Sequence, residues 1–426
     1  MDNKEISPKQ KSKKSLFRPP WKYREGFTVA LALMLAGFAI ELATPQPGIS
    51  IPSFPFNMYA GMAFITTIVF LHIFYRDVHM VRWLSTIPSA ISAICLIVVL
   101  TILMGVFEQD RPDAGGLKGA IGLSHLKNAW VFLLAQLYLL VSLGLAILKR
   151  AFPFRKRNAG FLLNHLGLWI VIAGASLGTG DLQRYRMDLY EDEPVWYAYD
   201  SHSNYYEMPF ALELINFDIE QYPPQLAVVD SHTGKLTDDS QRPLPYIEAG
   251  KTTQLMEWTI HIDEFFPMAL PQNGRVEYSE ETGAPPYARV RTANNTTGET
   301  HEGWISCGSF MHDTKLLWLD GRNVLVMTLP EPRRYFSNVI ALTPRDAPRE
   351  IVIEVNKPPK VAGWRLYQLS YNQAMGKWSD VSVIEAVKDP WLPVVYAGII
   401  MLFAGAAYIF WIGKEFKDED QAREPQ

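Results

Sequence analysis

Cysteine is scarce in this sequence of 426 residues: there are two, Cys95 and Cys307, and they lie far apart. Neither belongs to a Cys-x-x-Cys pair, so thiol–disulfide exchange has no motif behind it. The absence of Cys-x-x-Cys-His excludes a c-type cytochrome. We expect both cysteines to be small buried apolar residues. A basic composition is also lacking, because the formal net charge is −4, and nothing therefore indicates nucleic-acid binding.

Long hydrophobic runs, by contrast, are plentiful. Six have roughly the 18–25 residues needed to cross a hydrocarbon core about 30 Å thick. They are Phe27–Thr44, Met58–Tyr75, Trp83–Phe107, Ala129–Leu148, Gly160–Leu177 and Trp391–Gly413. The fifth run qualifies only if His165 is accepted inside the membrane. The first run follows a long basic tail and precedes Pro45-Gln46-Pro47, so we interpret it as a retained anchor and not as a cleavable signal.

Lysine and arginine gather in alternate loops, and such loops stay in the cytoplasm. The basic segments are the N-terminal tail, the loop at 76–82 and Lys149–Arg157, whereas the loops at 45–57 and 108–127 hold few basic residues. We therefore expect both termini in the cytoplasm and residues 180–389 on the opposite side.

Between the last two hydrophobic runs the chain is polar and typical of β-structure. Four short segments are rich in β-branched and aromatic residues, and the first two alternate with a period of two. They are Phe210–Glu220, Trp258–Phe265, Val324–Leu329 and Ile351–Val355. Turn-forming clusters separate them. This pattern predicts a β-sandwich or an open barrel. Tyr367 and Tyr371 lie four residues apart, and on a regular strand they would share a face, with Tyr367 in the core.

The predicted fold class is a polytopic α-helical membrane protein with about six transmembrane helices and a large β-rich extracytoplasmic domain. Its expected parts are a basic cytoplasmic tail (1–26), a five-helix transmembrane region (27–179), the β-rich domain (180–389), a final transmembrane helix (390–413) and a cytoplasmic tail (414–426).

The end of the β-rich region holds the most distinctive motif. Residues 355–371 read VNKPPKVAGWRLYQLSY, with Ser382-Val383 and then Asp389-Pro390 before the last hydrophobic run. Two further motifs precede it: Asn164-His165-Leu166-Gly167-Leu168 in the fifth run and Met208-Pro209-Phe210 at the first strand. In order and spacing these motifs resemble the ResB/CcsB family of cytochrome c biogenesis proteins, over residues 160–413. Family members commonly have three helices before the outer domain, whereas this chain has five hydrophobic runs there.

The resemblance implies a membrane subunit of a System II cytochrome c synthase in a bacterial inner membrane, with the large domain in the periplasm. Such a subunit handles haem b together with a ResC/CcsA-type partner that carries a tryptophan-rich signature. The two present haem to an apocytochrome c with a Cys-x-x-Cys-His motif, and a thiol reductant protein is a further possible partner. The twelve tryptophans of this chain are dispersed, so the resemblance implies the B subunit alone.

Histidines inside the membrane are candidate functional residues, because bilayers penalise polar side chains. His165 falls in the cytoplasmic third of the fifth run, and neutral imidazole is a good axial ligand for haem iron. Trp169, four residues on, shares its helix face and is placed to lie against a porphyrin edge. The alternative for His165 is a hydrogen bond across the helix bundle. The resemblance favours the haem ligand.

Two further histidines lie near the membrane runs. His72, near the inner end of the second run, has a depth similar to that of His165, so an internal bis-histidine site is one hypothesis and a histidine that reaches the interface is the other. His125, on the outer side, could face haem that leaves the membrane. His79 is expected to be solvated in a cytoplasmic loop. The others are expected on the surface or in packing: His202, His232, His261, His301 and His312.

Two other functions stay open at this point. One is a b-type cytochrome subunit that passes electrons between quinol and a periplasmic partner through His72 and His165. The other is a structural subunit without haem, whose β-rich domain docks another protein.

Overall fold

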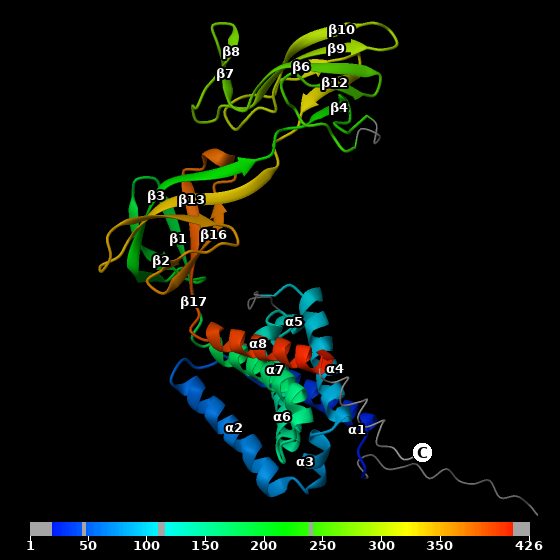
Figure 1. The fold of residues 1–426 in the computed structure, drawn as a ribbon, viewed down its shortest axis with the longest axis vertical. Coiled ribbons are helices and arrows are strands. Elements are labelled where there is room, and N and C mark those ends of the chain that lie inside the picture. Colours follow the sequence, from blue (N-terminus) through cyan, green and yellow to red (C-terminus); the bar gives the residue numbers. More distant parts are fainter. Residues whose placement is uncertain (1–18, 45–47, 110–115, 238–241, 412–426) are drawn as a thin grey trace, which may run out of the picture. The chain divides into compact units, whose positions relative to one another are not determined.

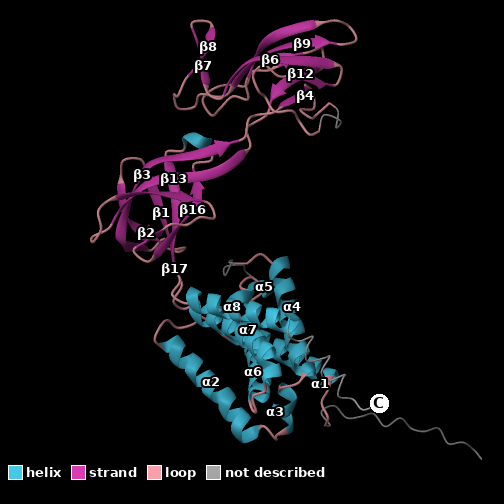
Figure 2. Cartoon of the chain, in the orientation of Figure 1, coloured by secondary structure: helices cyan, strands magenta, loops and turns pink. Residues whose placement is uncertain are grey.

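The computed structural model describes residues 19–44, 48–109, 116–237 and 242–411. Most of the expected N-terminal tail (1–26) and all of the expected C-terminal tail (414–426) lie outside the described residues. The chain divides into two compact units, one formed by residues 1–182 and 389–426 and the other by Gln183–Lys388. Helices make up the first, here called the helical unit, and strands dominate the second, the β unit (Figures 1 and 2).

In the described part of the helical unit, six helices are long and apolar enough to cross a membrane. They are α1 (Tyr23–Ala43), α2 (Phe56–Tyr75), α4 (Ile87–Val106), α6 (Trp130–Ala151), α7 (Ala159–Gly178) and α8 (Leu392–Trp411). Each lies on one of the six hydrophobic runs, which confirms the predicted helices. Shorter helices connect them: α3 (His79–Leu84), α5 (Leu117–Ala120), η1 (Leu126–Asn128) and η2 (Lys156–Asn158).

The start of the third run was predicted wrongly. Trp83 belongs to α3, and the long helix begins only at Ile87. Pro88 is the reason, because proline lacks a backbone N–H and therefore fits the first turn of a helix but not its interior. The hydrophobic run thus continues through a helix boundary that hydropathy does not detect.

α7 and α8 pack at close range through glycine. A Cβ atom on Gly167 would lie 2.6 Å from the carbonyl oxygen of Gly398, and one on Gly405 would overlap the backbone of Asn164. The Asn164 side-chain amide donates to the Leu402 carbonyl oxygen of α8 at 3.1 Å. Small residues let two backbones approach in this way.

One antiparallel sheet of eight strands contains both the first and the last strand of the β unit, β1 and β17. Its order is β14-β13-β3-β2-β1-β17-β16-β15. The strands are β1 (Gln183–Tyr190), β2 (Pro194–Tyr199), β3 (Tyr205–Gln221), β13 (Pro332–Leu342), β14 (Arg349–Glu354), β15 (Lys360–Val361), β16 (Trp364–Tyr371) and β17 (Val381–Lys388). Only residues 355–359 join the two edge strands, so the sheet curls until its edges meet. Arg349 Nη2 then donates to the Lys360 carbonyl oxygen at 2.8 Å.

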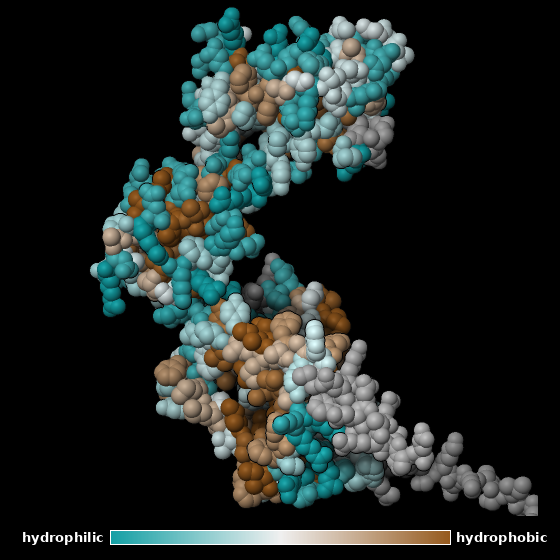
Figure 3. Space-filling model, viewed as in Figure 1, coloured by the Kyte–Doolittle hydropathy of each residue, from teal (hydrophilic) through white to brown (hydrophobic). Residues whose placement is uncertain are grey.

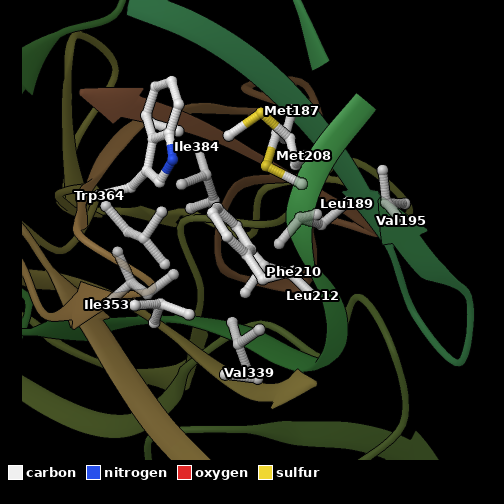
Figure 4. Packing of buried hydrophobic residues seen from close by; sticks show 14 of the residues in the cluster. Met187, Leu189, Val195, Met208, Phe210, Leu212, Val339, Ile353, Trp364 and Ile384 are labelled. Carbon is white, nitrogen blue, oxygen red and sulfur yellow. The ribbon is translucent and has the colours of Figure 1, made fainter. Parts of the chain in front are cut away.

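The inside of this curled sheet is a dense apolar core (Figure 4). Every strand of the sheet contributes to it, with Leu212, Leu366 and Ile384 fully buried. Trp364 is 5% exposed, and its ring lies 5.6 Å from that of Tyr185.

A second group of strands packs as two small sheets. A four-stranded sheet has the order β10-β9-β6-β5 and a three-stranded sheet the order β11-β12-β4. Their strands are β4 (Leu226–Asp230), β5 (Thr252–Leu255), β6 (Trp258–Phe266), β9 (Tyr287–Asn294), β10 (Thr300–Ile305), β11 (Leu317–Trp318) and β12 (Asn323–Met327). The core between them includes Trp258 and Cys307. Burial raises the pKa of the Cys307 thiol to about 11, so this cysteine stays protonated. A hairpin, β7 (Ala269–Gln272) and β8 (Arg275–Tyr278), and the short η4 (Gly376–Trp378) complete the unit.

The sequence predicted a sandwich or an open barrel. The two small sheets pack on a shared core as in a sandwich, and the eight-stranded sheet curls as in an open barrel. The expectation that Tyr367 and Tyr371 share a face is wrong. The pairing of β16 with β17 shifts between Gln368 and Ser370, so Leu369 is an extra residue that reverses the alternation. Tyr371 stacks on Phe217 with ring centroids 4.9 Å apart, whereas Tyr367 is only partly buried and lies outside the apolar core.

Surface hydropathy separates the two units. Hydrophobic side chains cover much of the visible surface of the helices, and hydrophilic ones cover most of the two-sheet lobe (Figure 3). The exposed apolar side chains on α2 include Phe70 and Phe74. Such a surface matches a hydrocarbon environment and not water.

Trp364→Ala is expected to lower the free energy of unfolding of the β unit by about 3–5 kcal/mol, because truncating a buried tryptophan leaves a cavity. Pulse proteolysis in urea measures the change. Leu369→Ala, on the same strand but 44% exposed, is the matched control and is expected to change stability much less. Equal effects of the two substitutions would contradict the assignment of the core.

Candidate functional site

His165 lies half-buried on α7 and contacts residues near the start of this helix. Its ring stacks on Phe161 with centroids 3.6 Å apart, and the Arg150 guanidinium lies 4.0 Å from the centre of the same phenyl ring. Nδ1 is 2.9 Å from the Phe161 carbonyl oxygen. A carbonyl oxygen only accepts, so Nδ1 carries the proton and Nε2 keeps its lone pair. This backbone bond orients the imidazole as histidine ligands of metals are usually oriented.

Trp169 lines an apolar groove where three helices meet. The groove, of about 170 Å³, is bounded by α2, α6 and α7 through Ile65, Ile68, Val69, Gly144, Ile147, Leu148, Leu166 and Trp169. The indole N–H donates to the Leu140 carbonyl oxygen at 3.1 Å, and the ring stacks on Phe64 at 6.4 Å. A Cβ atom on Gly144 would lie 3.1 Å from Ile68, so glycine lets α2 pack closely against α6 at this point.

His72 lines a basic pocket near the C-terminal end of α2. The pocket, of about 250 Å³, is lined by His72, Arg76, Asp77, Val81, Arg82, Ser85, Leu145, Lys149 and Phe152. Asp77 is the only acidic residue in this lining, and its carboxylate lies 3.6 Å from Arg82 and 4.0 Å from Arg76. The lining thus has three cationic side chains, Arg76, Arg82 and Lys149, and one highly exposed carboxylate, so the pocket favours an anion.

The apolar groove and the basic pocket follow one another along α2 and α6. Ile65, Val69 and His72 are spaced by four and three residues, so they share one face of α2. On α6, Leu148 lines the groove and the adjacent Lys149 lines the pocket. The predicted residues Trp169 and His72 thus belong to neighbouring parts of one helix junction. His165 lines neither cavity, although it lies one turn from Trp169 on α7.

His125 has a partner that the sequence did not indicate. Its Nε2 lies 2.8 Å from a carboxylate oxygen of Glu41, and both side chains are buried. Glu41 also accepts hydrogen bonds from the backbone N–H groups of Gly48 and Trp130, at 2.7 and 2.9 Å. The pair therefore joins α1 to the start of α6. A single carboxylate inside the otherwise apolar first run was the signal that could have identified it.

A second carboxylate, that of the partly exposed Asp181, joins one end each of α2, α7 and α8. Asp181 follows α7 and accepts from the Phe54 N–H at 2.7 Å, the Asn57 side-chain amide at 2.6 Å and the Trp391 indole N–H at 2.6 Å. Asn57, fully buried near the start of α2, also donates to the Leu177 carbonyl oxygen at 3.1 Å. We call this group the Asp181 junction.

The electrostatics of the Asp181 junction favour the carboxylate form. Partial burial by itself would raise the pKa of the Asp181 carboxyl. The three hydrogen bonds outweigh this effect and lower the pKa below its ordinary value. The side chain is therefore ionised at neutral pH.

Three of the remaining histidines, His261, His301 and His79, contact neighbouring side chains. His261 contacts Thr252 at 2.8 Å and His301 lies 3.2 Å from Glu299. His79 lies edge-on against Trp21 with centroids 5.3 Å apart, so it is not the solvated residue that was expected. Among the residues that the structure describes, no cluster of three or more His, Cys, Asp or Glu side chains is arranged to hold a metal ion.

Comparison with protein-family models and with curated proteins finds no match for this chain. The functional argument therefore rests on the residues and their arrangement.

Asp181→Asn is expected to destabilise the helical unit, because an amide cannot accept the same three hydrogen bonds. Losing one hydrogen bond to a charged group corresponds to about 1.5–3 kcal/mol. Thermal unfolding of the detergent-solubilised protein at neutral pH measures the effect. Asp313→Asn, at an exposed position, is the matched control.

The pH dependence of this difference tests its electrostatic origin. A carboxyl with a lowered pKa stabilises the fold above its unfolded pKa, and this contribution disappears as the pH falls through the folded pKa. The stability difference between wild type and Asp181→Asn is therefore expected to be full at neutral pH and to shrink below the ordinary aspartate pKa. A difference independent of pH would show that the carboxylate charge is not what holds the junction.

Proposed function

We propose that this chain is the haem-handling membrane subunit of a System II cytochrome c synthase, of the ResB/CcsB kind. In this proposal the six long helices cross a bacterial inner membrane, both termini are cytoplasmic and the β unit is periplasmic. The observation that carries the proposal is the succession of an apolar groove with Trp169 and a basic pocket with His72. Haem likewise has an apolar part and an anionic part, because its apolar porphyrin ring carries two propionate groups.

The residues of the helix junction fit haem b as a cargo. The groove wall, with Trp169, offers an apolar and aromatic surface for the porphyrin. Arg76, Arg82 and Lys149 are suited to carboxylates. The Nε2 lone pair of His165 and the imidazole of His72 are the candidate iron ligands. Haem, when bound, supplies the vinyl groups to which the thiols of an apocytochrome add.

The small size of the groove supports a partner subunit. Its 170 Å³ falls below the roughly 300–1,000 Å³ of sites that enclose a small molecule. A groove of this size covers one edge or face of a porphyrin, and a second membrane protein would cover the rest. The proposed partner is a ResC/CcsA-type tryptophan-rich protein. The proposed recipient is an apocytochrome c with Cys-x-x-Cys-His, kept reduced by a thiol reductant protein.

The proposed topology predicts opposite results for two reporter fusions. Alkaline phosphatase is active only outside the cytoplasm, so a fusion in the β9–β10 loop at Thr297 is expected to be active. A fusion at Phe154, in the basic loop before α7, is expected to be inactive. Enzyme activity normalised to fusion protein measures both. The reversed pair would contradict the orientation and the proposed function with it.

The haem proposal predicts that ligand histidines can be replaced chemically. His165→Gly and His72→Gly are each expected to lower the haem content of the complex purified with its partner, at near-normal protein levels. Free imidazole is expected to restore haem in a variant that lost a ligand, because it fills the vacated coordination site. The pyridine haemochrome spectrum measures haem per protein. His232→Gly, in the β unit, is the control.

The outcomes separate the functions that the sequence left open. Haem loss restored by imidazole in only one variant places one ligand in this chain and the other on the partner. Restorable loss in both variants places both ligands in this chain, and co-purification with a tryptophan-rich partner then separates the synthase subunit from the b-type cytochrome. Full haem in both would overturn the ligand assignments, and absence of haem from wild type would leave only the structural subunit.

A further inference from the structure

The β2–β3 hairpin of the β unit carries an exposed aromatic face. Tyr199 pairs with Tyr205 across the hairpin, and Tyr197 lies diagonally opposite Tyr205. The ring centroids of Tyr205 are 6.0 Å from Tyr197 and 6.3 Å from Tyr199. Tyr205 is 73% exposed and Tyr197 is 44% exposed. Trp196, 55% exposed, lies against Tyr197. None of these side chains belongs to the apolar core. The opposite face of the hairpin packs on that core, through residues such as Ala198.

The turn that supports this face is rigidly built. The Asp200 carboxylate accepts from the N–H groups of His202 and Asn204 and from the Asn204 side-chain amide, at 2.8–3.0 Å. It also accepts from the Tyr206 hydroxyl at 3.3 Å. These bonds lower the pKa of Asp200 to about 2. The hairpin therefore presents its tyrosines in a fixed arrangement rather than on a mobile loop.

Chain continuity fixes which end of the sheet this hairpin occupies. β1 begins at Gln183 and pairs with β17, which ends at Lys388, so both connections to the long helices leave from one end of the sheet. Tyr199 pairs with Arg186, and the turn after Tyr199 continues toward the level of Gln183. The hairpin tip is thus at the same end as both connections.

The connections are short. Four residues separate the end of α7 at Gly178 from Gln183, and three separate Lys388 from Leu392. Fully extended, the longer connection spans at most roughly 17 Å. The polar headgroup layer on each side of a bilayer adds roughly 5–7 Å to the hydrocarbon core. If α7 and α8 cross the membrane, the hairpin is within reach of this layer.

The composition of this sheet end suits the membrane interface. Tyrosine and tryptophan concentrate at the headgroup level, where one part of the ring is apolar and the other is hydrated. Arg184, Arg186 and Lys388 lie at the same end and are exposed. Basic side chains close to a bilayer are attracted to anionic headgroups. The carboxylates of Glu207 and Asp200 oppose this attraction, so the aromatic rings are the larger contribution.

We propose that the aromatic face of the β2–β3 hairpin, formed by Trp196, Tyr197, Tyr199 and Tyr205, binds the lipid headgroup layer of the membrane that α7 and α8 cross. The proposal rests on the membrane crossing put forward above. Its consequence is that the β unit has a second attachment to the bilayer besides its two chain connections.

The test uses the full-length protein in nanodiscs of phosphatidylcholine and phosphatidylglycerol that contain a headgroup-nitroxide lipid. Bimane is attached to Ser203→Cys at the hairpin tip, in a Cys95→Ala, Cys307→Ala background. Thr297→Cys, in the β9–β10 loop, is the matched exposed control. The expected result is strong quenching of bimane at position 203 and little at 297. Equal quenching at the two positions overturns the proposal.

A third label separates this proposal from the membrane crossing itself. Ile102 on α4 is 60% exposed, and bimane on Ile102→Cys is expected to be quenched by an acyl-chain nitroxide. Quenching at 102 without quenching at 203 overturns the hairpin proposal alone. Absence of quenching at 102 overturns the membrane crossing and both proposals.

Substitutions test whether the rings hold the hairpin on the lipid. The double variant Tyr197→Ser, Tyr205→Ser is expected to lose most of the quenching at position 203. The control double variant Tyr246→Ser, Tyr278→Ser, at two other exposed tyrosines, is expected to leave this quenching unchanged. Tyr205→Phe keeps the ring and is expected to retain quenching, which distinguishes lipid contact from misfolding. Unchanged quenching in the Tyr197, Tyr205 variant overturns the role of the aromatic face.

Discussion

The structure of the helical unit depends on two carboxylates, those of the buried Glu41 and the partly exposed Asp181, and on the groups that donate to them. At the Asp181 junction, three donors from two other helix ends converge on the carboxylate after α7. Glu41 does the same for α1 and the start of α6. In an apolar environment an unpaired charge is very unfavourable, so each carboxylate fixes the elements that pair with it. Single hydrogen bonds, such as those from Asn164 to Leu402 and from Trp169 to Leu140, and apolar packing add to these two anchors.

The groove that supports the functional proposal follows from this framework. The Asp181 junction anchors the start of α2, while most of that helix packs loosely and leaves side chains such as Phe70 and Phe74 exposed. Gly144 lets α2 approach α6 near Ile68, and beyond this point the apolar lining gives way to Arg76, Arg82 and Lys149. The junction of α2 with α3, α6 and α7 thereby carries the apolar and cationic surfaces that the proposed haem cargo would contact.

Local patterns predicted the helices and several strands, because a run of about twenty apolar residues or an alternation with a period of two can be recognised within one segment. Features that depend on residues far apart in the sequence could not be predicted in this way. Closure of the eight-stranded sheet depends on its strand order, and Leu369 reverses the faces of β16 only through its pairing with β17. The sequence identified His72 and Trp169 by residue type and depth. It could not show that they line neighbouring cavities, because several helices far apart in the sequence form those cavities. The partners of Glu41 and Asp181 lie up to 210 residues away, beyond any local pattern.

The central claim is that this chain, with a partner, binds haem b at the junction of α2, α6 and α7. The most direct measurement is the pyridine haemochrome spectrum of the wild-type protein purified from membranes that also contain a tryptophan-rich partner. The account predicts the spectrum of haem b in amounts comparable to the protein, with no covalent haem on this chain. Intact protein that co-purifies with the partner but contains no haem would contradict it.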